Sequence, residues 1–106
     1  MIKEITVQEL KQMIDNGHDF QLIDVREPHE YEICNLNGLL IPMNEVPDQT
    51  DKFDRQKTVV VHCRSGARSA RVIEYLQNAH GFTNLYNLKG GILAWADEID
   101  PSIQKY

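Results

Sequence analysis

Short apolar runs alternate with amphipathic helical stretches along this chain, and that alternation limits the folds it can adopt. The clearest run, residues 58–63, is rich in β-branched valine. Strands separated by helices imply β-α-β crossovers, which produce a parallel sheet covered on both faces. We therefore expect an α/β fold of three layers, α/β/α, with a central and mainly parallel sheet. The other predicted strands span residues 20–25, 39–42 and 84–88.

Helix signals fill the first part of the chain between these runs. Thr6 and Glu9 have the spacing of a capping box, at the start of a helix that Gly17 is placed to end. Pro28 suits the first turn of a short helix within residues 26–33.

The second half of the chain predicts two further helices. Residues 44–54 are polar and broken by Pro47, which indicates a loop with one helical turn. A longer helix then ends at Gly81, and a last one follows the glycine pair at 90–91. The longer helix is expected to bury one stripe of side chains, formed by Val72, Ile73, Tyr75, Leu76 and Ala79.

Composition is that of one soluble globular domain, residues 1–106, with 42% hydrophobic and 25% charged residues. Eleven basic and sixteen acidic residues give a net charge of −5, which argues against a nucleic-acid partner because such sites need a basic face. No apolar run approaches the ~18 residues of a transmembrane helix. The first ten residues lack the apolar core of a signal peptide. We expect a cytoplasmic protein with no membrane partner and two free cysteines.

The predicted strand at 58–63 ends in Cys63, at the edge of the sheet where ligands gather in parallel α/β folds. The thiolate is the reactive form of cysteine. The permanent charges of Arg64 and Arg68 favour that anion, as do the free amides at the start of the next helix. Gly66 permits the backbone angles that curl N–H groups into an anion-binding nest. This pattern predicts an activated nucleophile, and a buried structural cysteine is the plain alternative.

Other uses of such a cysteine fit the sequence less well. A thioredoxin-like redox site needs a second cysteine where Gly66 stands. A papain-like protease needs a histidine base, and His62 should point to the opposite face of the strand from Cys63. The cysteines and histidines lack metal-ligand spacing, so no metal is expected. A phosphatase of the Cys-x5-Arg type needs arginine where Ser69 stands, and Arg68 makes this loop one residue shorter. Nothing in the sequence brings the remaining histidines to the cysteine: His18, His29 and His80.

Residues 62–70 resemble the active-site loop of the rhodanese domains, a family of sulfurtransferases. Residues 22–31 and 87–99 resemble two further motifs of that family, in the same order, so the resemblance covers nearly the whole chain. One segment departs from the pattern. Where many members read Gly-His-Ile-x-Gly-Ala, residues 34–40 keep only Gly38 and the apolar character. Related phosphatases and arsenate reductases have a seven-residue loop, and the shorter loop here fits one extra sulfur atom better than a tetrahedral oxyanion.

The resemblance implies covalent, ping-pong chemistry without a cofactor. Cys63 would attack the outer sulfur of a donor such as thiosulfate and release sulfite. The resulting persulfide would pass its sulfur to cyanide, a thiol or a sulfur-carrier protein. The loop amides would stabilise the persulfide anion without a general base. The residues implied for substrate binding and for the loop are Arg64, Ser65, Gly66, Ala67, Arg68 and Ser69.

Charged residues near the loop are assigned supporting roles. Arg64 and Arg68 could bind the sulfonate of the donor, or Arg64 could be a solvated charge. We expect Arg68 to turn inward and pair with Asp24, because a carboxylate at a neighbouring strand end would otherwise be buried unpaired. Arg26 is expected either at the rim of the site or in a salt bridge.

Uncharged residues leave more alternatives open. Ser65 and Ser69 could donate hydrogen bonds to the sulfur or cap the helix. Cys34 could resolve the persulfide as a disulfide, although packing is the more ordinary role. Trp95 is expected in the core rather than in the site.

The carboxyl-terminal stretch, residues 90–106, most resembles rhodanese domains fused behind E1-like enzymes that adenylate sulfur-carrier proteins. A carrier or a persulfide-donating protein is therefore an implied partner, beside a small anionic donor. The start at Met1 favours an independent protein over the excised end of a longer one. A catalytically silent interaction module is the rival class, and the intact Cys63 weighs against it. A phosphatase or arsenate reductase relative is the third option.

Overall fold

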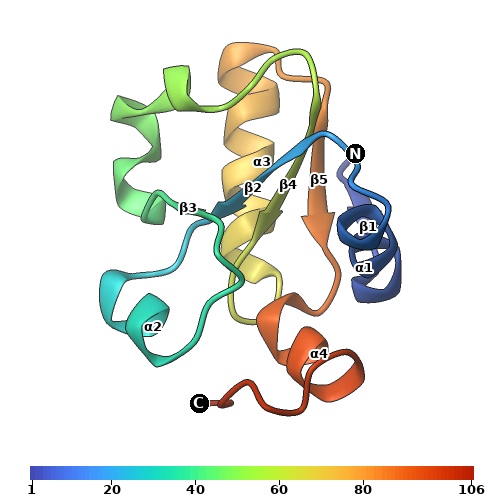
Figure 1. Cartoon of the computed structure of the whole chain (residues 1–106). Helices are drawn as coiled ribbons and strands as arrows, with labels where there is room; N and C mark the ends of the chain where they lie inside the picture. Colours follow the sequence, from blue (N-terminus) through green and yellow to red (C-terminus); the bar gives the residue numbers. More distant parts are fainter.

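The computed structural model describes all 106 residues and contains a five-stranded parallel sheet (Figure 1). The strand order is β1-β5-β4-β2-β3, so the α/β fold with a central parallel sheet is confirmed. The strands are β1 (Lys3–Ile5), β2 (Phe20–Asp24), β3 (Leu39–Leu40), β4 (Thr58–His62) and β5 (Leu85–Leu88).

The valine-rich β4 lies in the middle of the sheet because its side chains are apolar on both faces. It pairs with β2 in a register that sets Ile23 beside Val61 and Asp24 beside His62. The carboxyl ends of β2 and β4 therefore lie side by side, and Cys63 directly follows that edge. The strand β1 was not predicted, because only Ile5 of its three residues is buried and no apolar run marks it.

The helices begin and end at the expected signals. Helix α1 (Val7–Asp15) has the capping box: the Glu9 amide donates to Thr6 Oγ1 over 3.1 Å, and the Thr6 amide donates to Glu9 Oε1 over 2.8 Å. Helix α2 (Pro28–Ile33) starts with its proline. Helix α3 (Ala67–His80) and helix α4 (Gly91–Glu98) follow the loop and the glycine pair. None of these helices has the length and apolar composition that crossing a membrane requires.

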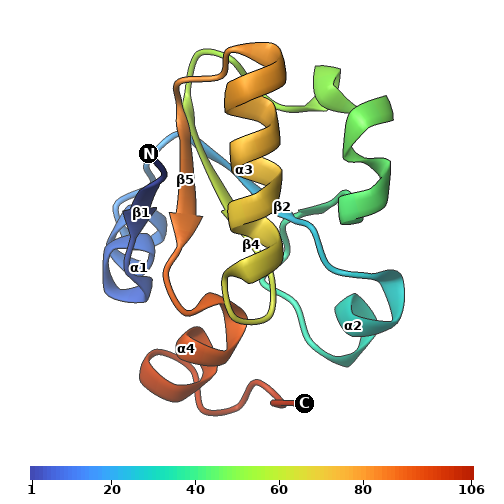
Figure 2. The same ribbon diagram turned by 180° about the vertical axis from the view of Figure 1, so that it is seen from behind.

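Two apolar clusters lie on opposite faces of the sheet. Figure 2 shows α3 in front of the strands, and on that side Val59 and Val61 pack with α3, with the 3-10 segment Met43–Asp48, and with Phe53, which follows a second 3-10 segment, Thr50–Lys52. The expected single helical turn there is thus two short 3-10 helices. On the other side α1 packs against α4, and Val60 joins a cluster that includes Trp95. The core position expected for Trp95 is confirmed.

The buried stripe of α3 is narrower than predicted. Val72, Ile73 and Leu76 are buried, whereas Tyr75 and Ala79 are exposed. At 3.6 residues per turn, Tyr75 and Ala79 lie at the edge of the helix face that Val72, Ile73 and Leu76 define, so they are not packed against the sheet. The Tyr75 hydroxyl instead meets His80 Nε2 at 3.2 Å on the helix surface.

Candidate active site

A tight loop joins β4 to α3 and carries Cys63 at its start. Gly66 has φ of 111°, a left-handed conformation that L side chains rarely adopt, and it caps the helix that begins at Ala67. The turn reverses the chain so that backbone amides of the first helical turn face back toward β4. The loop forms because a buried strand, a left-handed glycine and a helix start follow one another directly in the sequence.

Cys63 is 1% exposed, and its sulfur lies at the centre of this loop. The amides of Gly66 and Ser69 donate to Sγ over 3.1 and 3.4 Å. The Ser69 hydroxyl lies 3.3 Å from the same atom. Two directed amides and the positive end of α3 make this position favourable for a negatively charged sulfur. Ala67 and Ser65 are exposed on the outer side of the loop.

The first turn of helix α4 is hydrogen-bonded to the loop that carries Cys63. The amides of Ile92 and Leu93 donate to the carbonyls of Cys63 and Arg64 over 3.0 and 3.2 Å. A Cβ atom at Gly91, which has φ of 60°, would lie 2.5 Å from the Arg64 carbonyl oxygen. Only glycine allows this approach, which turns the loop carbonyls toward α4 and leaves amides to face the sulfur.

Asn87 on β5 contacts the loop, which the sequence pattern did not predict. The Ser69 hydroxyl donates to Asn87 Oδ1 over 2.5 Å, and Asn87 Nδ2 donates to the Gly66 carbonyl over 3.1 Å. Asn87 is buried, and both its amide oxygen and its amide nitrogen are hydrogen-bonded, as is usual for buried polar groups. The only available signal was a polar residue inside an apolar strand.

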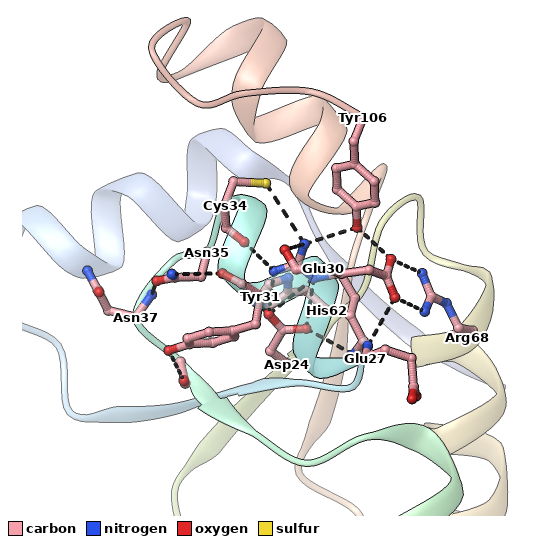
Figure 3. A network of polar contacts seen from close by, with 12 residues as sticks. Asp24, Glu27, Glu30, Tyr31, Cys34, Asn35, Asn37, His62, Arg68 and Tyr106 are labelled. Atoms are coloured by element: carbon pink, nitrogen blue, oxygen red, sulfur yellow. Dashed lines mark hydrogen bonds and ion pairs between the residues drawn. The ribbon is translucent and has the colours of Figure 1, made fainter.

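The expected pair between Arg68 and Asp24 is wrong. Arg68 makes a two-pronged ion pair with Glu30 of α2, with N–O distances of 2.6 and 2.8 Å (Figure 3). Asp24 pairs instead with Arg26 over 2.7 Å. The reason is strand alternation: Asp24 lies in register with His62, whose side chain points away from the face that carries Cys63 and α3.

Arg26 lies in a salt bridge and is completely buried, which decides between its two expected positions. Burial works to lower the pKa of its guanidinium, but the bonds to Asp24 and Tyr106 outweigh that and raise it above the ordinary value. Its nitrogens also donate to the carbonyls of Glu30 and Cys34, over 3.3 and 2.8 Å. The guanidinium thus joins β2, α2 and the segment after α2.

Tyr106 closes the network from the other end of the chain (Figure 3). Its hydroxyl accepts from Arg26 Nη1 over 3.0 Å and donates to Glu30 Oε2 over 2.7 Å. Burial raises the pKa of this phenol, so it remains a donor. The Arg64 guanidinium donates to the main-chain oxygen of Tyr106 and lies 5.0 Å from its ring centre. The hydrogen bonds from Arg68 hold the pKa of Glu30 far below its ordinary value.

His62 lies beside this network without a hydrogen bond to either ring nitrogen. Its Nε2 is 3.7 Å from Asp24 Oδ2, and burial lowers the pKa of the imidazole to about 4. The ring is therefore neutral at physiological pH. The hydrogen-bond partners of Cys63 Sγ come from Gly66 and Ser69 and include no histidine, and no group of three or more potential metal ligands occurs in the structure.

Cys34 is unpaired and half-buried, with Sγ 3.9 Å from Arg26 Nη1. The largest surface hollow, about 560 Å³, lies elsewhere, between α1, α4 and residues 35–38. No residue of the Cys63 loop lines it.

Residues 6–98 match the model of the rhodanese-like domain family. The chain belongs to that family. Solved structures that it resembles include two whose titles name a rhodanese-related or rhodanese-like protein. One from Staphylococcus aureus, titled a rhodanese-like domain protein, is 37% identical, has a TM-score of 0.81, and is matched over 92% of this chain and 95% of that one.

The relatives of this rhodanese-like domain differ in length. The putative sulfurtransferase YtwF of Bacillus subtilis is 39% identical over 101 residues, which is 94% of this chain and 96% of that protein. The rhodanese-like/PpiC domain-containing protein 12 of Arabidopsis thaliana is 40% identical, but this chain spans 38% of its length. The probable adenylyltransferase/sulfurtransferase MoeZ of Mycobacterium tuberculosis is 36% identical over 96% of this chain and 26% of its own length. Family membership and these names support sulfur transfer in general.

Proposed function

We propose that this chain is a sulfurtransferase that carries a sulfane sulfur as a persulfide on Cys63. The observation that carries the proposal is the pair of amides, from Gly66 and Ser69, that donate to Sγ of a cysteine at the end of the central strand. Such donors stabilise a negatively charged sulfur, both in the attacking thiolate and in the persulfide that follows. Thiosulfate or a persulfide is the proposed donor, and cyanide, a thiol or a sulfur-carrier protein is the proposed acceptor.

In the donor half-reaction the Cys63 thiolate attacks the outer sulfur of the donor. A sulfur–sulfur bond forms to Cys63, and the bond between the outer and inner donor sulfur breaks with its electron pair on the leaving group. Thiosulfate then leaves sulfite. In the second half-reaction an acceptor nucleophile takes the outer sulfur and restores the thiolate.

The arrangement suits this reaction because no proton has to be removed by a base once Cys63 is ionised. His62 points to the other face of the sheet, and no other histidine contacts the sulfur. The Ser69 hydroxyl, which donates to Asn87 in the structure, lies 3.3 Å from Sγ and can turn to donate to Sγ or to its attached sulfur instead. Gly91 and α4 keep the loop carbonyls turned away from the anion.

A protein acceptor is favoured as the physiological partner by the similarity to MoeZ, whose name joins adenylyl transfer to sulfur transfer. The exposed outer side of the loop, at Ser65 and Ala67, leaves room for a partner surface. The alternatives are a catalytically silent interaction module and a phosphatase or arsenate reductase relative.

Intact mass spectrometry tests the proposal. The protein and its Cys63→Ser variant are treated with thiosulfate, and separately with cysteine persulfide, under oxygen-free conditions. We expect a gain of about 32 Da, one sulfur atom, in the wild type alone, and its removal by cyanide. If neither donor adds sulfur to Cys63, the sulfurtransferase proposal is wrong and the interaction module takes its place.

A further inference from the structure

Three arginines surround the Cys63 loop, and their partners decide how much positive charge is left for a substrate. Arg26 offers none, because it is completely buried and its charge is matched by Asp24. Its remaining donors are taken by two backbone carbonyls and by the Tyr106 hydroxyl. This arginine is part of the interior rather than of the binding surface.

Arg68 lies in the first turn of α3, directly after the Cys63 loop, and its hydrogen bonds to Glu30, with a smaller contribution from Cys63, raise the pKa of its guanidinium. Both terminal nitrogens are engaged by the two oxygens of Glu30, over 2.6 and 2.8 Å. Glu30 is almost buried, and Tyr106 donates a further bond to it. These bonds hold the carboxylate ionised, so the Arg68–Glu30 pair adds no net charge to the site (Figure 3).

Arg64 is then the one cation of the three without an acidic side chain beside it. It is exposed, and its guanidinium contacts the main-chain oxygen and the ring of Tyr106. The surroundings of the nucleophile therefore offer at most one positive charge that no acidic side chain matches, and that charge lies on an exposed side chain in contact with Tyr106.

That balance matters because possible donors differ in charge. Thiosulfate is a dianion, and its attack by a thiolate brings three negative charges together and ends with sulfite leaving as a dianion. The protonated persulfide of a thiol, R–S–SH, is neutral at the reacting sulfurs. Like charges in a partly buried site repel strongly, so the dianion needs cations that the persulfide does not need.

We propose that Glu30 sets donor choice: by occupying Arg68, it selects organic persulfides over dianionic thiosulfate. This inference rests on the proposed sulfur transfer and assigns its donor class. In the reaction the Cys63 thiolate bonds to the outer sulfur of R–S–SH and the donor S–S bond breaks. The R–S⁻ thiolate leaves, and the proton stays on the transferred sulfur. Charge is the same before and after, and no oxidant or reductant is required.

Loading of Cys63 measures donor choice without involving an acceptor. The second-order rate constants for the 32-Da gain are compared for cysteine persulfide and for thiosulfate, using the wild type and Glu30→Gln. Glutamine keeps the size and one acceptor oxygen but releases the charge of Arg68. The matched control is Glu32→Gln, which removes an equal charge from an exposed position of the same helix.

We expect the wild type to load faster from cysteine persulfide. Glu30→Gln should raise the thiosulfate constant about tenfold, mainly by tightening thiosulfate binding, and leave the persulfide constant within about twofold. Glu32→Gln should change neither. A merely structural role for Glu30 would lower both constants together, so the ratio separates the two explanations.

Two results would overturn the inference while the sulfur-transfer proposal stands: a wild-type preference for thiosulfate, or a donor ratio that Glu30→Gln leaves unchanged. The wild-type comparison needs no variant, so it decides even if Glu30→Gln does not fold. Loading by neither donor would instead remove the sulfur-transfer proposal itself.

Discussion

The guanidinium of Arg26 and the hydroxyl of Tyr106 are 80 positions apart in the chain and share a hydrogen bond of 3.0 Å. The same hydroxyl donates a hydrogen bond to Glu30, and Glu30 forms the ion pair with Arg68. One phenol therefore connects the buried ion pair of β2 to the arginine of the Cys63 loop. This connection makes the tyrosine a structural part of the site.

Replacing Tyr106 with phenylalanine tests that connection. The change leaves Arg26 with an unused donor and removes one bond from Glu30, so we expect a loss of about 1–2 kcal/mol in the free energy of unfolding. Urea denaturation measures it. Tyr86→Phe is the control, because the Tyr86 hydroxyl makes no hydrogen bond and only its ring contacts Lys3. Equal losses in both variants would contradict the assigned role.

His62 predicts an unusual pH dependence of stability. Its folded pKa of about 4 lies below the ordinary 6.5, so the unfolded chain binds the proton more readily. Stability from this group is complete above pH 6.5 and is lost as the pH falls toward 4. Between pH 7.5 and 5 the expected loss is about 2 kcal/mol.

The matching variant is His62→Leu, followed by denaturation at the same two pH values. It should lack most of the loss, because nothing titrates at that position. Glu30, whose pKa is lowered, acts only below about its ordinary value of 4.5, outside the chosen interval. A wild type as stable at pH 5 as at pH 7.5 would show that the ring is not buried as a neutral group.

Gly91→Ala should destabilise the Cys63 loop by more than the strain of a left-handed alanine alone. The new Cβ would lie 2.5 Å from the Arg64 carbonyl oxygen, whereas at Gly17, with a similar φ, it would meet nothing within 4 Å. We expect Gly17→Ala to cost about 1–2 kcal/mol, the ordinary left-handed penalty, without slowing sulfur loading. Gly91→Ala should cost more in denaturation and slow loading of Cys63. Similar results for the two variants would contradict the close approach of α4.

The two serines of the loop should differ in their effect on sulfur loading. Ser69 Oγ lies 3.3 Å from Sγ, whereas Ser65 is exposed. Losing one hydrogen bond of about 1 kcal/mol predicts a fall of roughly fivefold in the loading rate of Ser69→Ala. Ser65→Ala should take up sulfur at the wild-type rate. If Ser65→Ala is slowed and Ser69→Ala is not, the hydroxyl that assists loading belongs to Ser65 and the prediction is wrong.

Local signals explain why much of the fold was predictable. The valine run of β4, the Thr6–Glu9 capping box and the glycines that end helices each act within a few residues. The position of Cys63 at a strand end follows from the same local pattern. Strand β1 was not predicted because it is defined by its pairing with β5, whereas its own three residues form no apolar run.

The partners around the site could not be predicted in the same way. The choice of Glu30 over Asp24 for Arg68 depends on how α2 lies against α3, and on which face of β2 each side chain takes. Asn87 reaches Ser69 only because β5 lies next to β4. The sequence shows these residue types but not the tertiary packing that joins them.

The contacts from α4 and Tyr106 also have a consequence for synthesis. Cys63 emerges from the ribosome before Gly91 and Tyr106, although its loop is ordered by both ends of that later segment. Chains fold from the amino terminus as they are made. A nascent chain therefore passes through a stage in which the thiol is present but not yet sheltered, and its cradle is completed only when residues 91–106 have folded back onto it.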